Sequence, residues 1–134
     1  MSLYNIKKKS ADIVKYVWSQ EFDIDNGAGT TVDQIVLSLP VAATVVNAAV
    51  VYTVATDSAG SASATVKIGT SVGGAQIVAA ANLEISKSVG GRTDLTIAAG
   101  NVAAAGFVNV RHTGVAATEA GKYKVMIGYR IGAE

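Results

Sequence analysis

Apolar and polar residues alternate along several stretches of this chain, and alternation with a period of two is typical of a half-buried strand. The stretch 12–24 predicts a first strand, which Asp25-Asn26-Gly27 ends as a turn. Its apolar residues would share one inward face: Val14, Tyr16, Trp18, Phe22 and Ile24. Lys122–Ile131 predicts a last strand, with Tyr123, Val125 and Ile127 inward.

Four further stretches between these two predict strands. Thr31–Leu39 would turn Ile35, Leu37 and Leu39 inward and end at Pro40, which cannot donate to a ladder. Thr44–Ala55 is apolar on both faces, as in a central strand. Ser63–Gly69 follows a polar turn, with its inward positions at Ala64, Val66 and Ile68, so Val45–Ile68 is interpreted as a β-hairpin. Gly106–His112 places Val108 and Val110 on one side.

The middle of the chain has a weaker pattern. Ala75–Leu83 is rich in alanine and predicts a short helix or a packed loop. Leu83–Ser88 and the pair Leu95 and Ile97 predict short strands, separated by a Val89-Gly90-Gly91 turn.

These patterns together predict an all-β fold. About seven or eight short strands with Gly-rich turns and no long amphipathic helix favour an antiparallel β-sandwich, jelly-roll-like in topology. The chain has 134 residues, which suits one domain. Residues 1–11 are interpreted as an extended N-terminal arm, with a disordered terminus as the alternative, and residues 12–134 as the sandwich domain.

Composition narrows the classes of function. Hydrophobic residues make up 50% of the chain but aromatic residues only 6%, so alanine and valine supply most of the core. The formal net charge is +1, and the basic run Lys7-Lys8-Lys9 is too short for a nucleic-acid footprint. There are no cysteines, which excludes disulfides and thiolate metal sites. No signal-peptide pattern or membrane-spanning stretch is found, so we expect a soluble protein made in the cytoplasm.

No constellation of residues predicts a catalytic, cofactor or metal site. His112 has no nucleophile context and is interpreted as a surface or interface histidine. A glycosidase needs a pair of carboxylates, and five are available: Glu21, Asp23, Glu84, Asp94 and Glu119. Their pattern in the sequence does not indicate such a pair. Asp23–Gly27 lacks the distal glutamate of a calcium loop. Gly69–Gly74 lacks the lysine of a phosphate-binding loop, and both stretches are interpreted as turns. Lys7, Lys8 and Lys9 remain as candidate partner-binding residues on the arm.

Three segments carry a resemblance. They are residues 39–53, which begin Leu39-Pro40-Val41-Ala42-Ala43-Thr44-Val45, residues 63–70, which contain Ala64-Thr65-Val66-Lys67-Ile68-Gly69-Thr70, and residues 118–129, which contain Ala120-Gly121-Lys122-Tyr123. They resemble small β-rich virion structural proteins of tailed bacteriophages, namely head decoration (cement) proteins and fibre-type modules. The resemblance covers about half of the chain and implies a structural role, oligomers and no catalytic residues.

The leading hypothesis is therefore a non-enzymatic decoration protein on the capsid exterior of a virion. It would bind the major capsid protein and itself, as a trimer or a dimer, without nucleic acid, membrane or cofactor. The alternative is a receptor- or glycan-binding module of a fibre or spike, with Tyr4, Tyr52, Tyr123 and Tyr129 as candidate stacking residues. A catalytic β-domain, such as a depolymerase or lyase acting through Glu21 or Asp23, is the third hypothesis.

Overall fold

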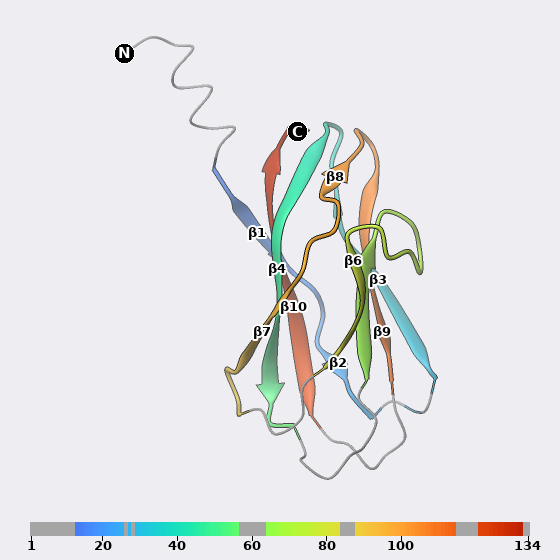
Figure 1. The fold of residues 1–134 in the computed structure, drawn as a ribbon, viewed down its shortest axis with the longest axis vertical. Coiled ribbons are helices and arrows are strands. Elements are labelled where there is room, and N and C mark those ends of the chain that lie inside the picture. The colour runs from blue at the N-terminus through green and yellow to red at the C-terminus, as the bar shows by residue number, and fades with distance from the viewer. Residues whose placement is uncertain are drawn as a thin grey trace.

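Two antiparallel sheets lie face to face and enclose the core between them (Figure 1). The computed structural model describes residues 13–25, 27, 29–56, 64–83, 88–114 and 121–132. Within these ranges the chain forms ten strands and no helix, so no helix there could cross a membrane. The predicted antiparallel β-sandwich is confirmed. The ten strands exceed the predicted seven or eight because two pairs of residues, at β2 and β8, form short strands of their own.

The six-stranded sheet has the order β1-β10-β4-β7, with β2 paired to β10 and β8 paired to β4. Its strands are β1 (Lys15–Trp18), β2 (Phe22–Asp23), β4 (Ala43–Val54), β7 (Arg92–Leu95), β8 (Asn101–Val102) and β10 (Lys122–Ile131). The four-stranded sheet has the order β3-β9-β5-β6. Its strands are β3 (Thr31–Ser38), β5 (Thr65–Gly69), β6 (Val78–Asn82) and β9 (Phe107–Thr113).

The core forms where inward residues of the two sheets meet. Three of the predicted strands appear as β4, β9 and β10. In β9 and β10 the alternation correctly predicted the inward residues Val108, Val110, Tyr123, Val125 and Ile127, each 0% or 1% exposed. In β4, where both faces were predicted to be apolar, Val50 and Tyr52 are equally buried. β4 is a central strand, as its apolar composition predicted, because it pairs with β10 on one side and with β7 and β8 on the other.

The predicted hairpin Val45–Ile68 is wrong. β4 belongs to the six-stranded sheet, whereas β5 belongs to the four-stranded sheet and pairs with β6 and β9. The inward positions of β5 were predicted correctly, since Ala64, Val66 and Ile68 are buried. The chain therefore crosses from one sheet to the other between these two apolar strands.

The alanine-rich stretch is a strand and not the predicted short helix or loop. β6 pairs with β5, with Thr65 opposite Asn82 and Val66 opposite Ala81. Ile77, Val78 and Leu83 anchor its two ends in the core. The predicted strand at Leu95 and Ile97 is β7, which ends at Leu95. Most of the predicted strand Leu83–Ser88 lies outside the described residues.

The first strand is interrupted, which the alternation did not predict. β1 and β2 are separated by Ser19, Gln20 and Glu21, and the inward parity changes there. Ser19 is 5% exposed and Val17 is packed against the core, whereas Tyr16 and Trp18 are exposed. Phe22 and Ile24 are buried, as predicted. The predicted inward orientation of Tyr16 and Trp18 is therefore wrong.

Hydrogen bonds of Ser19 explain this interruption. Its N–H donates to the Val125 carbonyl (2.9 Å), and its Oγ accepts from the Val125 N–H (2.8 Å). One serine thus supplies both ladder contacts to β10 where the backbone turns out of register. A similar irregularity lies in β3 between Ile35 and Leu37, and it leaves Ile35 exposed where an inward side chain was predicted.

Candidate interaction surface

β1 is an edge strand that carries two exposed aromatic rings. It pairs with β10, and the structure describes no second ladder partner for it. Tyr16 is 54% exposed and Trp18 is 48% exposed, while Ile13 just before the strand is 57% exposed. Tyrosine and tryptophan are enriched in protein interfaces, because each combines a large apolar ring with a polar group. We name Ile13, Tyr16 and Trp18 the aromatic edge.

The Tyr16 ring lies next to a glycine of the neighbouring strand β10. It lies opposite Gly128 of β10, which in turn lies opposite Asn47 of β4. A Cβ at Gly128 would overlap the Asn47 side chain and would lie 2.9 Å from the Tyr16 ring atom Cε1. Because Gly128 has no side chain, the Tyr16 ring and the Asn47 amide can both approach its backbone closely. Asn47 Oδ1 is buried there without a hydrogen-bond partner in the described part of the chain.

Lys7, Lys8 and Lys9 lie outside the described residues, so their role stays a prediction. The described chain begins at Ile13, in the aromatic edge, and β1 follows directly. Residues 1–12 therefore directly precede the aromatic edge in the sequence. Lysine side chains of β10, at Lys122 and Lys124, lie on the same sheet and are half-buried.

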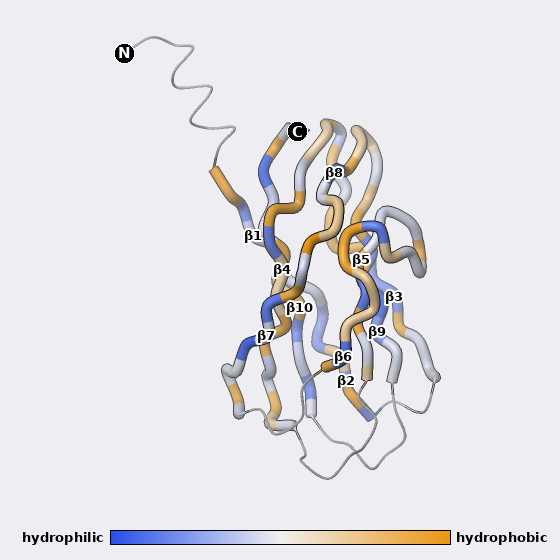
Figure 2. The backbone as a smooth tube through the Cα atoms, in the orientation of Figure 1, coloured by the Kyte–Doolittle hydropathy of each residue, from blue (hydrophilic) through white to orange (hydrophobic). Residues whose placement is uncertain are grey.

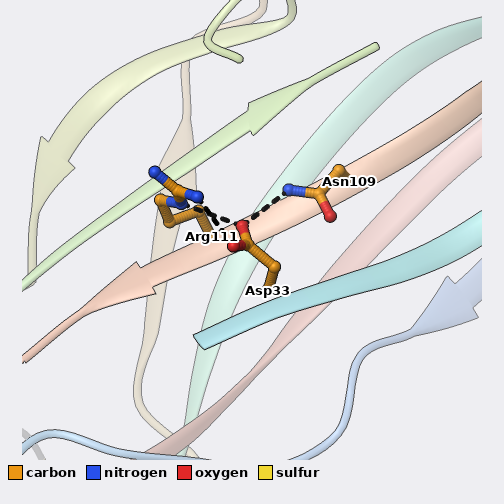
Figure 3. Close-up of polar contacts among 3 residues, drawn as sticks. All are labelled: Asp33, Asn109 and Arg111. Atoms are coloured by element: carbon orange, nitrogen blue, oxygen red, sulfur yellow. Dashed lines mark hydrogen bonds and ion pairs between the residues drawn. The ribbon is translucent and has the colours of Figure 1, made fainter. Parts of the chain in front are cut away.

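A polar cluster occupies the four-stranded sheet (Figure 3). Arg111 donates to Asp33 from Nε (2.9 Å) and from the terminal nitrogen Nη2 (2.7 Å), and Asn109 Nδ2 donates to the same carboxylate (3.0 Å). The Arg111 hydrogen bonds lower the pKa of Asp33 and outweigh partial burial, which raises it. The carboxylate is held ionised by three donors, as in a structural cross-strand lock between β3 and β9. We assign this cluster to stability.

His112 is buried, so its predicted position at the surface is wrong. It is 0% exposed, and its ring is stacked on Phe22 with centroids 5.6 Å apart. Nδ1 is 2.6 Å from the Tyr123 hydroxyl, and the ring also forms a hydrogen bond with the Asp23 backbone. Burial lowers the pKa of His112 to about 4, and burial raises the pKa of Tyr123. The imidazole is therefore neutral at pH 7 and joins β9 to β10 across the core.

The carboxylates considered for catalysis are separately engaged. Glu21 accepts from the Thr53 hydroxyl (2.6 Å), and Asp94 forms an exposed ion pair with Arg92 (2.7 Å). A hydrogen bond with Asp25 raises the pKa of Asp23, and partial burial adds to this effect. Glu84 and Glu119 lie outside the described residues. The described ranges hold no group of three or more acidic or histidine residues suited to a metal ion.

The glycine-rich stretch 69–74 is a turn, as predicted. Gln76 closes it, since Oε1 accepts from the Thr70 N–H (3.0 Å) and Nε2 donates to Ser71 Oγ (3.2 Å). These contacts engage one backbone N–H and one hydroxyl group of the turn. A Cβ at Gly69 or Gly74 would overlap the Gln76 side chain, so the closure of the turn explains these two glycines.

Sequence reasoning missed the aromatic edge and proposed other aromatic residues for stacking. Tyr52 and Tyr123 are 0% exposed and cannot stack on a sugar, Tyr129 is half-buried, and Tyr4 lies outside the described residues. The polar Gln20 inside the apolar series was the one indication that the first strand breaks and that its parity changes. Given that break, the exposure of Tyr16 and Trp18 could have been found.

Two solved structures contain chains with a fold similar to this sandwich. A chain of the cyanophage Pam1 capsid asymmetric unit matches with a TM-score of 0.61 and 20% identity, over 89% of this chain and 85% of that chain. A chain of the capsid of Ralstonia phage GP4 matches with a TM-score of 0.54 and 19% identity, over 92% and 88%. The fold is shared with chains of two phage capsids. No protein-family model and no curated protein matches the sequence.

Proposed function

We propose that this protein is a non-enzymatic structural protein of a tailed-phage virion, bound as a decoration protein on the outside of the head. The observation that carries the proposal is the shared fold: both matches lie in phage capsid structures, and each covers most of both chains. The sequence resemblance quoted above supports the same class independently.

The surface of the domain agrees with a role in assembly. The aromatic edge is an exposed apolar feature on an edge strand, which is the type of surface that proteins cover in complexes. Described polar groups that could have served catalysis are instead engaged in structural contacts, as shown for His112, Asp33 and Glu21. We assign the role of the protein to its surfaces.

In this proposal the arm formed by residues 1–11 tethers the domain to the major capsid protein. Lys7, Lys8 and Lys9 would supply charge-assisted contacts, and copies of the domain would associate with each other, as trimers in preference to dimers. The domain would then stabilise the head by burying surface across the contacts between capsid subunits.

Co-sedimentation with heads assembled from the phage's own major capsid protein tests the proposal. The full-length chain is expected to bind heads in many copies per particle, and a chain lacking residues 1–10 is expected to bind at least tenfold more weakly while keeping its β circular-dichroism spectrum. Matched charge variants, Lys7→Gln, Lys8→Gln and Lys9→Gln combined, separate charge from length. Full binding by the truncated chain would reject the tether, and no binding by the full-length chain would reject the decoration role.

A glycan-binding module remains the second candidate because Tyr16 and Trp18 are exposed and flat rings of this kind can stack on sugars. A glycan-array hit that is lost in a Trp18→Ala variant, together with no binding to heads, would favour it over decoration.

A further inference from the structure

The opposite side of the domain carries an apolar cleft. β6 and β7 are the edge strands of the two sheets on that side, and the cleft between them has a volume of about 240 Å³. Its apolar lining comes from both strands and the segment after β7: Val78, Ala79, Ala81, Leu95 and Ala98. Thr93, Asp94 and Thr96 add polar groups on the β7 side. The Ala98 N–H donates to the Ile77 carbonyl (2.8 Å), so the two sheets are joined at one end of the cleft.

The β6 edge lacks the usual protection of an edge strand. Its sequence, Val-Ala-Ala-Ala-Asn, contains no charged residue and no proline, and Figure 2 colours most of it as apolar. Ala79 and Ala80 are exposed. Natural edge strands are commonly blocked by lysine, proline or an inward charge, because a flat apolar edge pairs with other chains. An unblocked edge beside an apolar cleft is therefore suited to contact with another protein surface.

The same chain supplies a surface that fits this cleft. The sheet order β1-β10-β4-β7 places the aromatic edge and the cleft on opposite edges of the six-stranded sheet. Trp18 is 48% exposed on the first edge. An apolar cavity of about 150 Å³ holds a benzene ring, so a cleft of about 240 Å³ has room for an indole. The net charge of +1 opposes self-association only weakly.

We propose that Trp18 of one copy docks in the β6–β7 cleft of a second copy. A projecting ring on one edge and an open cleft on the other make a heterologous contact, which repeats head to tail and closes into a ring when the rotation allows it. This inference deepens the proposed function by naming the contact between copies, and it is tested without phage heads.

Mixing of two complementary variants gives the sharpest test. Trp18→Ser removes the ring but keeps the cleft, whereas Ala79→Arg blocks the cleft but keeps the ring. Each variant alone should be monomeric by light scattering after size exclusion, with association weakened by about 30-fold or more, as for a central aromatic hot spot. An equimolar mixture should form dimers of one copy of each variant, because one intact ring then meets one intact cleft.

Two further variants serve as controls. Ile35→Ser removes a comparably exposed apolar side chain from the other sheet and should leave the wild-type assembly unchanged. Ala98→Arg blocks the cleft from its opposite wall and replaces Ala79→Arg if that variant does not fold by circular dichroism. A wild-type chain that is monomeric at every concentration, or a mixture that stays monomeric, would overturn the contact.

The outcome is distinguishable from that of the head-binding experiment. Assembly that follows the mixing rule in a protein that does not bind heads would refute decoration and leave this contact standing. Binding to heads by a chain whose copies never associate would do the reverse.

Discussion

The buried histidine predicts a specific dependence of stability on pH. His112 is fully buried between Phe22 and Tyr123, and its pKa of about 4 lies well below the ordinary value of 6.5. Between these two values the unfolded chain binds a proton at His112 that the folded chain does not bind. The stability that the neutral imidazole contributes is therefore complete above pH 6.5 and is lost as the pH falls towards 4.

The magnitude follows from the difference between the two pKa values. A difference of about 2.5 pKa units at about 1.4 kcal/mol each gives a loss of about 3.5 kcal/mol between pH 6.5 and pH 4. A domain of this size is stable by roughly 5–15 kcal/mol, so the loss is a large share of the total. Below pH 4 the contribution of His112 should stop changing, because both states are then protonated.

Urea denaturation at fixed protein concentration, repeated from pH 7 to pH 4, measures this loss. A fixed concentration is needed because association of copies would also shift the apparent stability. The matched variant is His112→Gln, which keeps hydrogen-bonding groups but does not titrate. Carboxylates such as Asp33 and Asp23 titrate in both proteins, so their effects cancel in the difference. Equal pH dependence of the two proteins would refute the assignment of a depressed pKa to His112.

Three substitutions test the local geometry by the same denaturation assay. Tyr123→Phe leaves His112 Nδ1 buried without its 2.6 Å partner and should cost about 1–3 kcal/mol; an unchanged midpoint would count against that hydrogen bond. Gly128→Ala adds a Cβ under the Tyr16 ring and should cost about 1–3 kcal/mol; a neutral result would mean that the ring does not cover the glycine. Ser19→Ala removes the acceptor of a buried N–H and should cost about 1–2 kcal/mol, and no loss would show that water replaces the hydroxyl.

The long strands could be predicted from the sequence because their burial is simple. β10 has one face on the core, so Tyr123, Val125 and Ile127 recur at every second position. β4 is buried on both faces at Ala48, Ala49 and Val50, and its continuous apolar run reflects that position. In both strands the hydrophobic pattern of the sequence matches the burial of the strand faces.

Strand pairing could not be predicted from the same patterns. β5 pairs with the following strand β6 and with the distant β9, not with the preceding β4, and its own apolar pattern does not distinguish these partners. The alanines of β6 have little intrinsic preference for a strand, and Val78 and Leu83 fix the segment by burial at its ends. Tertiary contacts override local propensity at such a position.

The aromatic edge could not be predicted because the local alternation does not show where a strand is interrupted. An inward and an outward residue of a strand differ by one position, so one irregularity reverses the assignment of every side chain on one side of it. At Ser19 the chain uses a side-chain hydroxyl in place of a regular ladder contact, and this moves Trp18 from the predicted core to the solvent. A tryptophan that looks like core in the sequence and is exposed in the fold retains its apolar area without a partner. The interruption at Ser19 thus both defeats the prediction of the first strand and creates the projecting ring on which the proposed contact between copies depends.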